Sequence, residues 1–218
     1  MGFWIPAFAG MTITHVMSSE EKFVHLHVHS HFSLLTGLPK IKELVKTAKE
    51  RGFSSLALTD YGSMYGMIKF FETCQKEEIK PIVGCEIFVA VDSRFDKRHK
   101  IDNQASHLVL LAETFEGYQN LMQLSSLGHL EGFYYRPRVD RELLQKYSKG
   151  LIALSGCISG EVPQLIAQGA DDARVDEKIK WYVDCFGKEN FFLELQDHPE
   201  KEGQMNVNNA LIEAAKRN

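Results

Sequence analysis

The chain has 218 residues, of which 44% are hydrophobic and 25% charged, as is usual for a folded globular protein. A formal net charge of −4 argues against nucleic-acid binding through a broad basic surface, so local groups must hold any phosphate. Four cysteines are scattered without a CxxC pair, which favours reduced thiols in a cytoplasmic protein over a disulfide framework.

The first sixteen residues differ from the rest of the chain. No Lys or Arg precedes their apolar part, unlike a signal peptide, and Pro6 and Gly10 break a stretch too short to span a membrane. We interpret residues 1–16 as an extension outside the fold, with Met17 as the natural start. Residues 17–218 are then expected to form one domain.

From residue 23 onward, strand and helix patterns alternate. Strands are predicted at 23–29, 54–60, 80–92, 107–113, 151–156 and 190–197. Helices are predicted at 39–52, 63–77, 116–130, 161–169, 170–187 and toward Asn218, with a short one after the loop that begins at 131. Near-continuous apolar strands between helices predict an α/β fold, with a mostly parallel sheet or barrel and helices outside. The chain stops where another strand is expected, so we predict an incomplete domain.

The first predicted strand carries histidines at every second position. His25, His27 and His29 share one face of a strand, and imidazoles so placed can converge on one metal ion. A solvated histidine face is an equal alternative for an isolated HxH motif.

Three further residues stand out among or beside apolar strands. Glu86 has apolar neighbours and needs a metal or a basic partner to offset its burial. His107 opens a strand and Cys157 follows one. Each alone is typical of a core residue, whereas together imidazole and thiolate suit zinc.

Other polar residues are weaker candidates. Asp60 ends a strand, and we interpret it as the N-cap of the next helix rather than as a ligand. Glu194, near Asp197 and His198, is a second carboxylate within an apolar strand.

Two groups of basic residues could meet phosphate. Arg136 and Arg138, beside two tyrosines, are candidates to hold a phosphate or a stacked base. The loop 94–100 is interpreted as a solvated charged loop.

An ordered series of motifs is more specific than any single one. The series is FVHLHVHSHFSLLTG, LALTDYGSMYG, IKPIVGCEIFVA, HLVLLAETFEGYQNL, EGFYYRPRVDRELL and GLIALSGCISGEVPQ. Over residues 22–218 it resembles the polymerase and histidinol phosphatase (PHP) domain. GYQNL and YYRPRVDRE are similar to the branch of that family found at the N-terminus of the alpha subunit of bacterial DNA polymerase III. The resemblance implies a distorted β/α barrel, truncated here at its C-terminus, with a metal cluster at the carboxyl ends of its strands.

The resemblance also implies a ligand set. Matched by motif, the ligands are His27, His29, Glu86, His107 and Cys157. They would bind a divalent metal (zinc, manganese or magnesium) that supports phosphoester hydrolysis, including 3′→5′ exonuclease activity.

Two positions depart from the family pattern. Thr36 stands where intact sites have Asp, and Tyr61 where they have His. A final Asp-x-His pair would lie beyond Asn218. We therefore expect a partly degenerate site.

For function, the resemblance implies that the full polypeptide extends DNA from deoxynucleoside triphosphates. Its partners would be other replicase subunits, a proofreading exonuclease and a sliding clamp, with no membrane. The carboxylates of polymerisation are not in this chain, so we expect a structural platform. Two alternatives stay open: an active metal-dependent exonuclease, and a free-standing phosphoesterase such as histidinol phosphatase.

Overall fold

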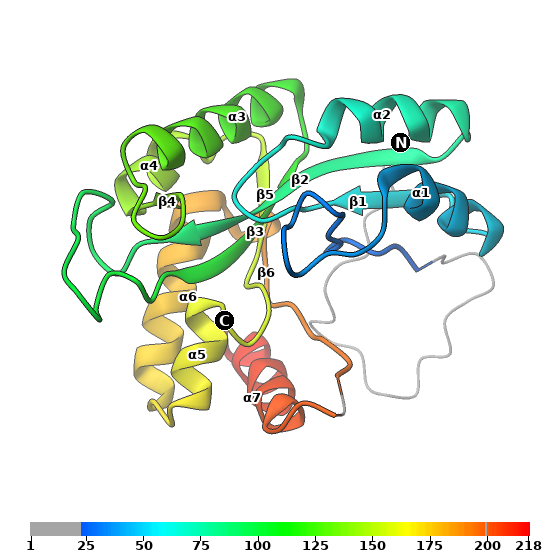
Figure 1. Cartoon of the computed structure of the whole chain (residues 1–218). Helices are drawn as coiled ribbons and strands as arrows, with labels where there is room; N and C mark the ends of the chain where they lie inside the picture. Colours follow the sequence, from blue (N-terminus) through cyan, green and yellow to red (C-terminus); the bar gives the residue numbers. More distant parts are fainter. Residues whose placement is uncertain (1–22, 199) are drawn as a thin grey trace.

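The computed structural model describes residues 23–198 and 200–218. The extension predicted at 1–16 and the start at Met17 lie outside the described residues, so that boundary stays a prediction. In the described part, seven α-helices and six strands alternate along the chain (Figure 1). The predicted α/β class is confirmed.

The strands form one sheet in which β1, β2, β3, β5 and β6 lie side by side in that order, and β4 pairs with β2. Their bounds are β1 Ser55–Leu58, β2 Lys80–Val89, β3 Ser106–Ala112, β4 Arg138–Val139, β5 Leu151–Leu154 and β6 Phe191–Phe192. The sheet is mixed, because β3 runs antiparallel to both β2 and β5. The loop between β2 and β3 contains no helix to return the chain, so β3 pairs with β2 in the reverse direction.

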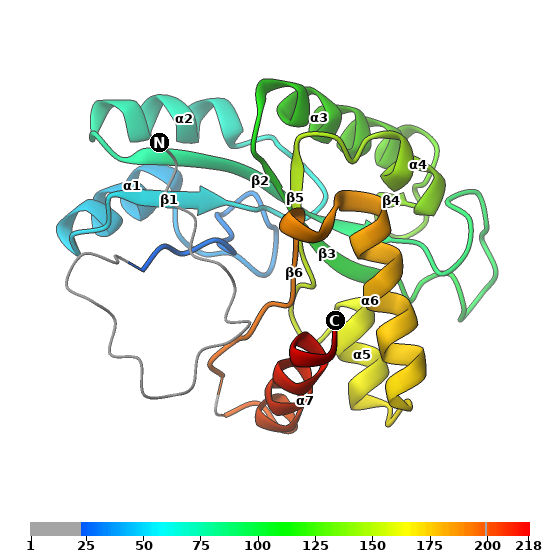
Figure 2. The ribbon, with the colours of Figure 1, turned by 180° about the vertical axis from the view of Figure 1, so that it is seen from behind.

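The helices cover the outside of this sheet. They are α1 Ile41–Glu50, α2 Met67–Lys76, α3 Phe115–Leu130, α4 Arg141–Lys146, α5 Glu161–Ala167, α6 Asp172–Phe186 and α7 Gln204–Arg217, with a 3₁₀ turn at Lys188–Asn190. In both ribbon views α1 and α2 lie near β1, and α5, α6 and α7 gather at the other end (Figures 1 and 2). Thr114, Asp140 and Asp171 start α3, α4 and α6 by accepting hydrogen bonds from backbone amides.

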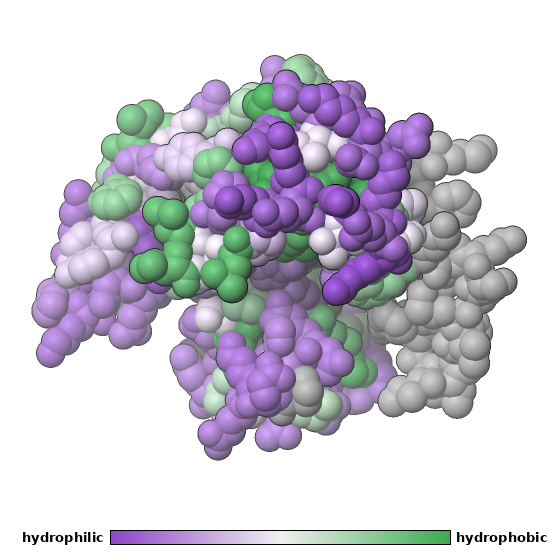
Figure 3. Space-filling view, turned by 45° about the vertical axis from the view of Figure 1, so that its right-hand side comes forward, coloured by the Kyte–Doolittle hydropathy of each residue, from purple (hydrophilic) through white to green (hydrophobic). Residues whose placement is uncertain are grey.

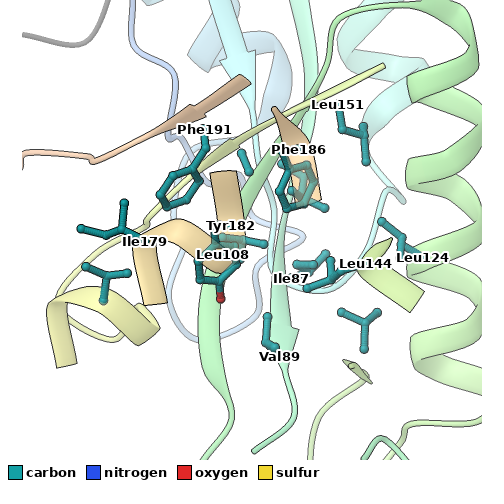
Figure 4. Close-up of a cluster of buried hydrophobic side chains, with 14 of the residues drawn as sticks. Ile87, Val89, Leu108, Leu124, Leu144, Leu151, Ile179, Tyr182, Phe186 and Phe191 are labelled. Carbon is teal, nitrogen blue, oxygen red and sulfur yellow. The ribbon is translucent and has the colours of Figure 1, made fainter. Parts of the chain in front are cut away.

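Both faces of the central strands are buried, which explains their continuous apolar runs. In β3, Leu108 and Leu110 join the main core under α3 and α6, while Val109 and Leu111 join a smaller cluster on the opposite face. Figure 4 shows part of the main core, which includes Leu108 of β3 and Tyr182 and Phe186 of α6. A side chain on the opposite face therefore points away from the main core.

Two predicted strands are not formed as expected. Residues 23–29 are extended beside β1 but are not a regular strand, because the Val28 amide donates to Thr59 Oγ1 instead of a backbone carbonyl. The strand predicted at 190–197 ends at Phe192. Its ladder stops because the Glu194 amide donates to the Ser155 hydroxyl.

The face seen in Figure 3 is mostly hydrophilic, with separate apolar patches. Among the exposed apolar residues are Leu34, Leu35 and Leu38, on the loop that follows the histidines. None of the helices in the described residues has the length and apolar character needed to cross a membrane.

Candidate metal centre

Glu86 lies at the centre of a converging group of side chains. It sits in the middle of β2, opposite Val109 of β3, and is fully buried. Because side chains alternate along a strand, its carboxylate points away from the main core that holds its neighbours Cys85 and Ile87. A carboxylate in such a place needs partners that offset its loss of hydration.

Three imidazoles supply those partners. Glu86 Oε2 lies 2.7 Å from His27 Nε2 and 2.6 Å from His29 Nε2. Its other oxygen, Oε1, lies 2.7 Å from His107 Nδ1. The structure thus brings side chains from two separate segments, the histidine segment and β3, to one carboxylate on β2.

Local hydrogen bonds place the two neighbouring histidines. The Ala57 amide donates to the His25 carbonyl at 3.1 Å, and the Thr59 amide to the Val28 carbonyl at 2.8 Å. This attachment to β1 aims His27 and His29 at Glu86. His25 does not join them, because it lies between the rings of Phe23 and Phe53.

His107 and Cys157 meet where β3 begins and β5 ends. Cys157 Sγ lies 3.9 Å from His107 Nδ1 and accepts a hydrogen bond from the Ser159 amide. Burial alone would raise the pKa of the Cys157 thiol, but His107 and the Ser159 amide outweigh it and lower that pKa. Burial would lower the pKa of His107, yet Cys157 and Glu86 raise it to about 9.

The pKa values of His27 and Glu86 are also set by burial on one side and hydrogen bonds on the other. Burial opposes the charge of His27, but its hydrogen bonds to Glu194 and Glu86 raise its pKa to about 10. Burial would likewise raise the pKa of Glu86, whereas His107, His27 and His29 hold it far below its usual range. Glu86 is therefore an anion surrounded by nitrogen atoms.

These side chains form two sets of possible metal ligands that share Glu86. One set is His27, His29 and Glu86, and the other is Glu86, His107 and Cys157; within each set the ligand atoms lie within 4.8 Å of one another. Carboxylate oxygen, imidazole nitrogen and thiolate sulfur are the donors that zinc prefers. The residues present therefore fit one or two divalent cations, with Glu86 between them.

The two positions that depart from the family pattern do not supply ligands. The exposed Thr36 donates its hydroxyl to the Ser33 carbonyl at 3.0 Å. The Tyr61 ring packs on His29 at 4.2 Å between centroids and contacts His107 edge-on. Burial and the nearby Glu86 raise the pKa of the Tyr61 phenol, so it stays neutral at physiological pH.

Asp60 has a different role from the predicted helix cap. It is buried and accepts hydrogen bonds from the Ser30 amide, the Ser30 hydroxyl and the Ser33 hydroxyl. The interpretation as an N-cap is therefore wrong. The next helix, α2, has Gly66 as its N-cap, and Asp60 instead fixes the turn that follows His29 through the hydroxyls of Ser30 and Ser33.

The two arginines predicted to bind phosphate differ in burial. Arg138 is fully buried and donates to the backbone carbonyls of Gly132, Asp102, Arg94 and Asp96. Its prediction as a phosphate or DNA contact is wrong, because its donors are already used inside the protein. Arg136 is exposed and lies over the Phe88 ring at 4.8 Å, so its role stays a prediction.

The loop 94–100 is mostly exposed, as predicted, except at Arg94. Arg94 is buried and pairs with Glu131, Asp140 and Glu142, which corrects the interpretation of that position. Arg98 is partly exposed and pairs with Asp92 and Asp102.

Sequence reasoning ranked Glu194 low and missed Gln196. Glu194 Oε1 lies 2.7 Å from His27 Nδ1, and Gln196 donates to the same oxygen at 2.7 Å. The signal for Glu194 in the sequence was a carboxylate in an apolar run. Its partner His27 lies 167 residues earlier in the chain, so their contact could not be predicted from the sequence. A cavity of about 360 Å³ opens beside this group, lined by His27, His29, Tyr61, Cys157, Gln196, His198, Glu200 and Lys201.

A larger hollow of about 640 Å³ lies elsewhere, along α5 and α6. Several of its charged side chains pair with one another: Glu161 with Arg141 and Lys178, and Lys180 with Asp184. Among the described residues, both groups of three possible metal ligands contain Glu86, and neither lies along this hollow.

Comparison with known families agrees with this geometry. The family model described as "PHP domain" matches residues 25–198. The chain belongs to the PHP domain family. The matched range of the PHP domain contains all five converging residues, from His27 to Cys157.

Curated relatives of this PHP domain carry the name DNA polymerase III subunit alpha. The protein from Treponema pallidum is 49% identical over 81% of this chain, and that from Borreliella burgdorferi is 46% identical over 90%. The protein from Deinococcus radiodurans is 46% identical over 89%. The chain spans only 15 to 17% of the length of these relatives.

Proposed function

We propose that this chain is the N-terminal PHP domain of a bacterial DNA polymerase III alpha subunit. We further propose that it serves as a structural platform, built around a metal centre with fewer ligands than the family pattern. One observation carries the proposal. Side chains from β3, the turn after β5 and the histidine segment converge on the buried Glu86 of β2, in a chain that is 46 to 49% identical to these polymerase subunits. The full polypeptide would act on DNA and deoxynucleoside triphosphates in the cytoplasm, with a proofreading exonuclease and a sliding clamp as partners.

Within this domain, five residues would hold the metal. His27 and His29 would bind from one side of Glu86, and His107 and Cys157 from the other. A bound divalent cation would polarise a phosphoester and lower the pKa of water. Asp60 keeps the His29 turn in place, and Tyr61 covers His29 where a further ligand would otherwise stand.

The smaller number of ligands favours a structural platform over an enzyme. Thr36 is turned into its own loop and Tyr61 stays neutral, so neither offers a charge to a further cation. An active metal-dependent 3′→5′ exonuclease remains the second candidate, because the cavity of about 360 Å³ gives access to His27, His29 and Cys157. A free-standing phosphoesterase is less well supported, since the relatives reported above are polymerase subunits.

The test combines metal analysis with a nuclease assay on the same sample. Zinc and manganese are quantified in the purified chain, which is then incubated with a 3′-labelled single strand, with and without chelator. Stoichiometric metal without digestion supports the platform, and chelator-sensitive digestion favours the exonuclease. A chain without metal contradicts the metal centre.

One substitution ties either result to the site. Glu86→Ala removes the oxygen atoms shared by both ligand sets, so bound metal should fall to background. Glu116→Ala, which removes an exposed carboxylate that pairs with Lys149, is the matched control and should keep its metal. Retention of metal by Glu86→Ala, with its fold checked by circular dichroism, would place the ion elsewhere.

A further inference from the structure

The imidazole of His27 is held on both of its nitrogen atoms. Nε2 lies 2.7 Å from Glu86 Oε2 and faces His29, while Nδ1 lies 2.7 Å from Glu194 Oε1. An imidazole that binds a metal through one nitrogen must carry its proton on the other. A carboxylate at Nδ1 selects the tautomer that leaves Nε2 free for a cation.

Glu194 is itself fixed by neighbours from three parts of the fold. Its amide donates to Ser155 Oγ at 2.8 Å, just after β5. Gln196 donates to its Oε1, and the Gln196 carbonyl accepts from Asn208 of α7 at 2.8 Å. The carboxylate therefore meets His27 in a set orientation rather than by chance.

The other oxygen of Glu194 argues against a purely structural role. Within residues 23–198 and 200–218, Oε2 is buried and has no hydrogen-bond partner. A carboxylate placed for stability alone would be expected to use both oxygens or to reach water. Its position is better explained by what Oε1 does to His27.

We propose that Glu194 is a positioning residue of the metal centre, which accepts the Nδ1 proton of His27 and turns Nε2 toward the cation. The inference rests on the proposed function, because it requires an ion bound by His27. In the described chain, His29 and His107 each form their side-chain hydrogen bonds through a single ring nitrogen. Glu194 therefore acts on His27 alone.

The first test measures zinc affinity of the full chain by competition with a chromophoric chelator. Loss of a carboxylate behind a ligating histidine weakens metal binding by about 10- to 100-fold, and this is the result expected for Glu194→Ala. Glu194→Gln keeps an oxygen that can accept the proton, so its loss should be smaller. Asp197→Asn, an exposed carboxylate three residues away, is the control and should bind zinc like the unchanged chain.

A double substitution separates positioning from general damage. In a His27→Ala background there is no imidazole to orient, so Glu194→Ala should cause no further loss of affinity. A further loss of the same size as in the unchanged background would overturn the inference.

The outcomes also separate this inference from the proposed function. Unchanged zinc binding by both Glu194 variants would overturn the positioning role and leave the metal centre intact. No zinc binding by the unchanged chain would overturn both. Circular dichroism without zinc checks the fold of each variant. If Glu194→Ala does not fold, the zinc affinity of Glu194→Gln tests the inference.

Discussion

The four cysteines illustrate how the surroundings of a residue set its chemistry. Burial raises the pKa of Cys74 to about 12 and that of Cys185 to about 11, and it raises the pKa of Cys85 still further. Cys157 differs because His107 and the Ser159 amide lower its pKa. Only the thiolate is a nucleophile or a metal ligand, so Cys157 is the cysteine suited to both.

This difference predicts selective alkylation. At neutral pH and without metal, iodoacetamide should label Cys157 well before the other three cysteines, as measured by peptide mass spectrometry over time. Added zinc should protect Cys157, because a bound cation occupies the sulfur. Labelling of Cys185 at an equal rate would contradict the low pKa of Cys157.

A second prediction concerns two arginines that are two residues apart. Arg138→Met removes the donors to four buried backbone carbonyls and should lower the free energy of unfolding by about 3 kcal/mol. Arg136→Met loses one contact with the Phe88 ring, worth about 0.5–1 kcal/mol. Urea denaturation of both variants gives the comparison, and equal losses would contradict the structural role of Arg138.

At the scale of single residues, the possible metal ligands were easier to predict from the sequence than the residues that hold them in place. Glu86, His107 and Cys157 stood out because a polar group in an apolar strand requires an explanation. Arg138 did not, since its flanking tyrosines resemble an exposed binding motif and its carbonyl partners lie up to 44 residues away. Asp60 was misread because its serine partners precede it by 27 and 30 residues.

Among the elements, the histidine segment depends on β1 for its position. Thr59 contacts Val28 through its side chain as well as its backbone: the Val28 amide donates to Thr59 Oγ1, and that hydroxyl donates to the Val28 carbonyl. Val28 lies between His27 and His29. The hydroxyl therefore holds both histidines at once.

Thr59→Val tests this attachment. The substitution keeps the volume of the side chain but leaves the Val28 amide without its partner, which should cost about 1–3 kcal/mol of stability. Zinc affinity should fall as well, because both histidines lose their support. Thr73→Val, on an exposed part of α2, is the control and should change neither urea stability nor zinc affinity.

Element boundaries were predictable where apolar periodicity was strong. The face of α1 formed by Ile41, Val45 and Ala48 is buried as its spacing indicates. The ends of the strands were not predictable, because Ser155 and Thr59 replace backbone partners with side-chain ones. The direction of β3 was also missed, since apolar runs carry no information on direction.

For the molecule as a whole, the possible ligands come from distant parts of the chain. They span residues 27 to 157 and belong to β2, β3, the turn after β5 and the histidine segment. Such a site exists only in the folded protein, so metal binding and folding are linked.

The linkage gives a quantitative prediction. Zinc at 100 times its dissociation constant should raise the free energy of unfolding by about 2.7 kcal/mol. Thermal unfolding followed by circular dichroism, with and without zinc, measures this shift. Glu86→Gln should abolish it, and a zinc effect of the same size in that variant would indicate binding outside the centre.

The dispersed ligands also bear on the lifetime of the folded chain. The cation can bind only after β2, β3 and β5 have paired and the histidine segment has settled on β1. A contact that forms last leaves the rate of refolding unchanged and slows unfolding by its full contribution. A bound cation would then lengthen the lifetime of the folded domain without speeding its folding.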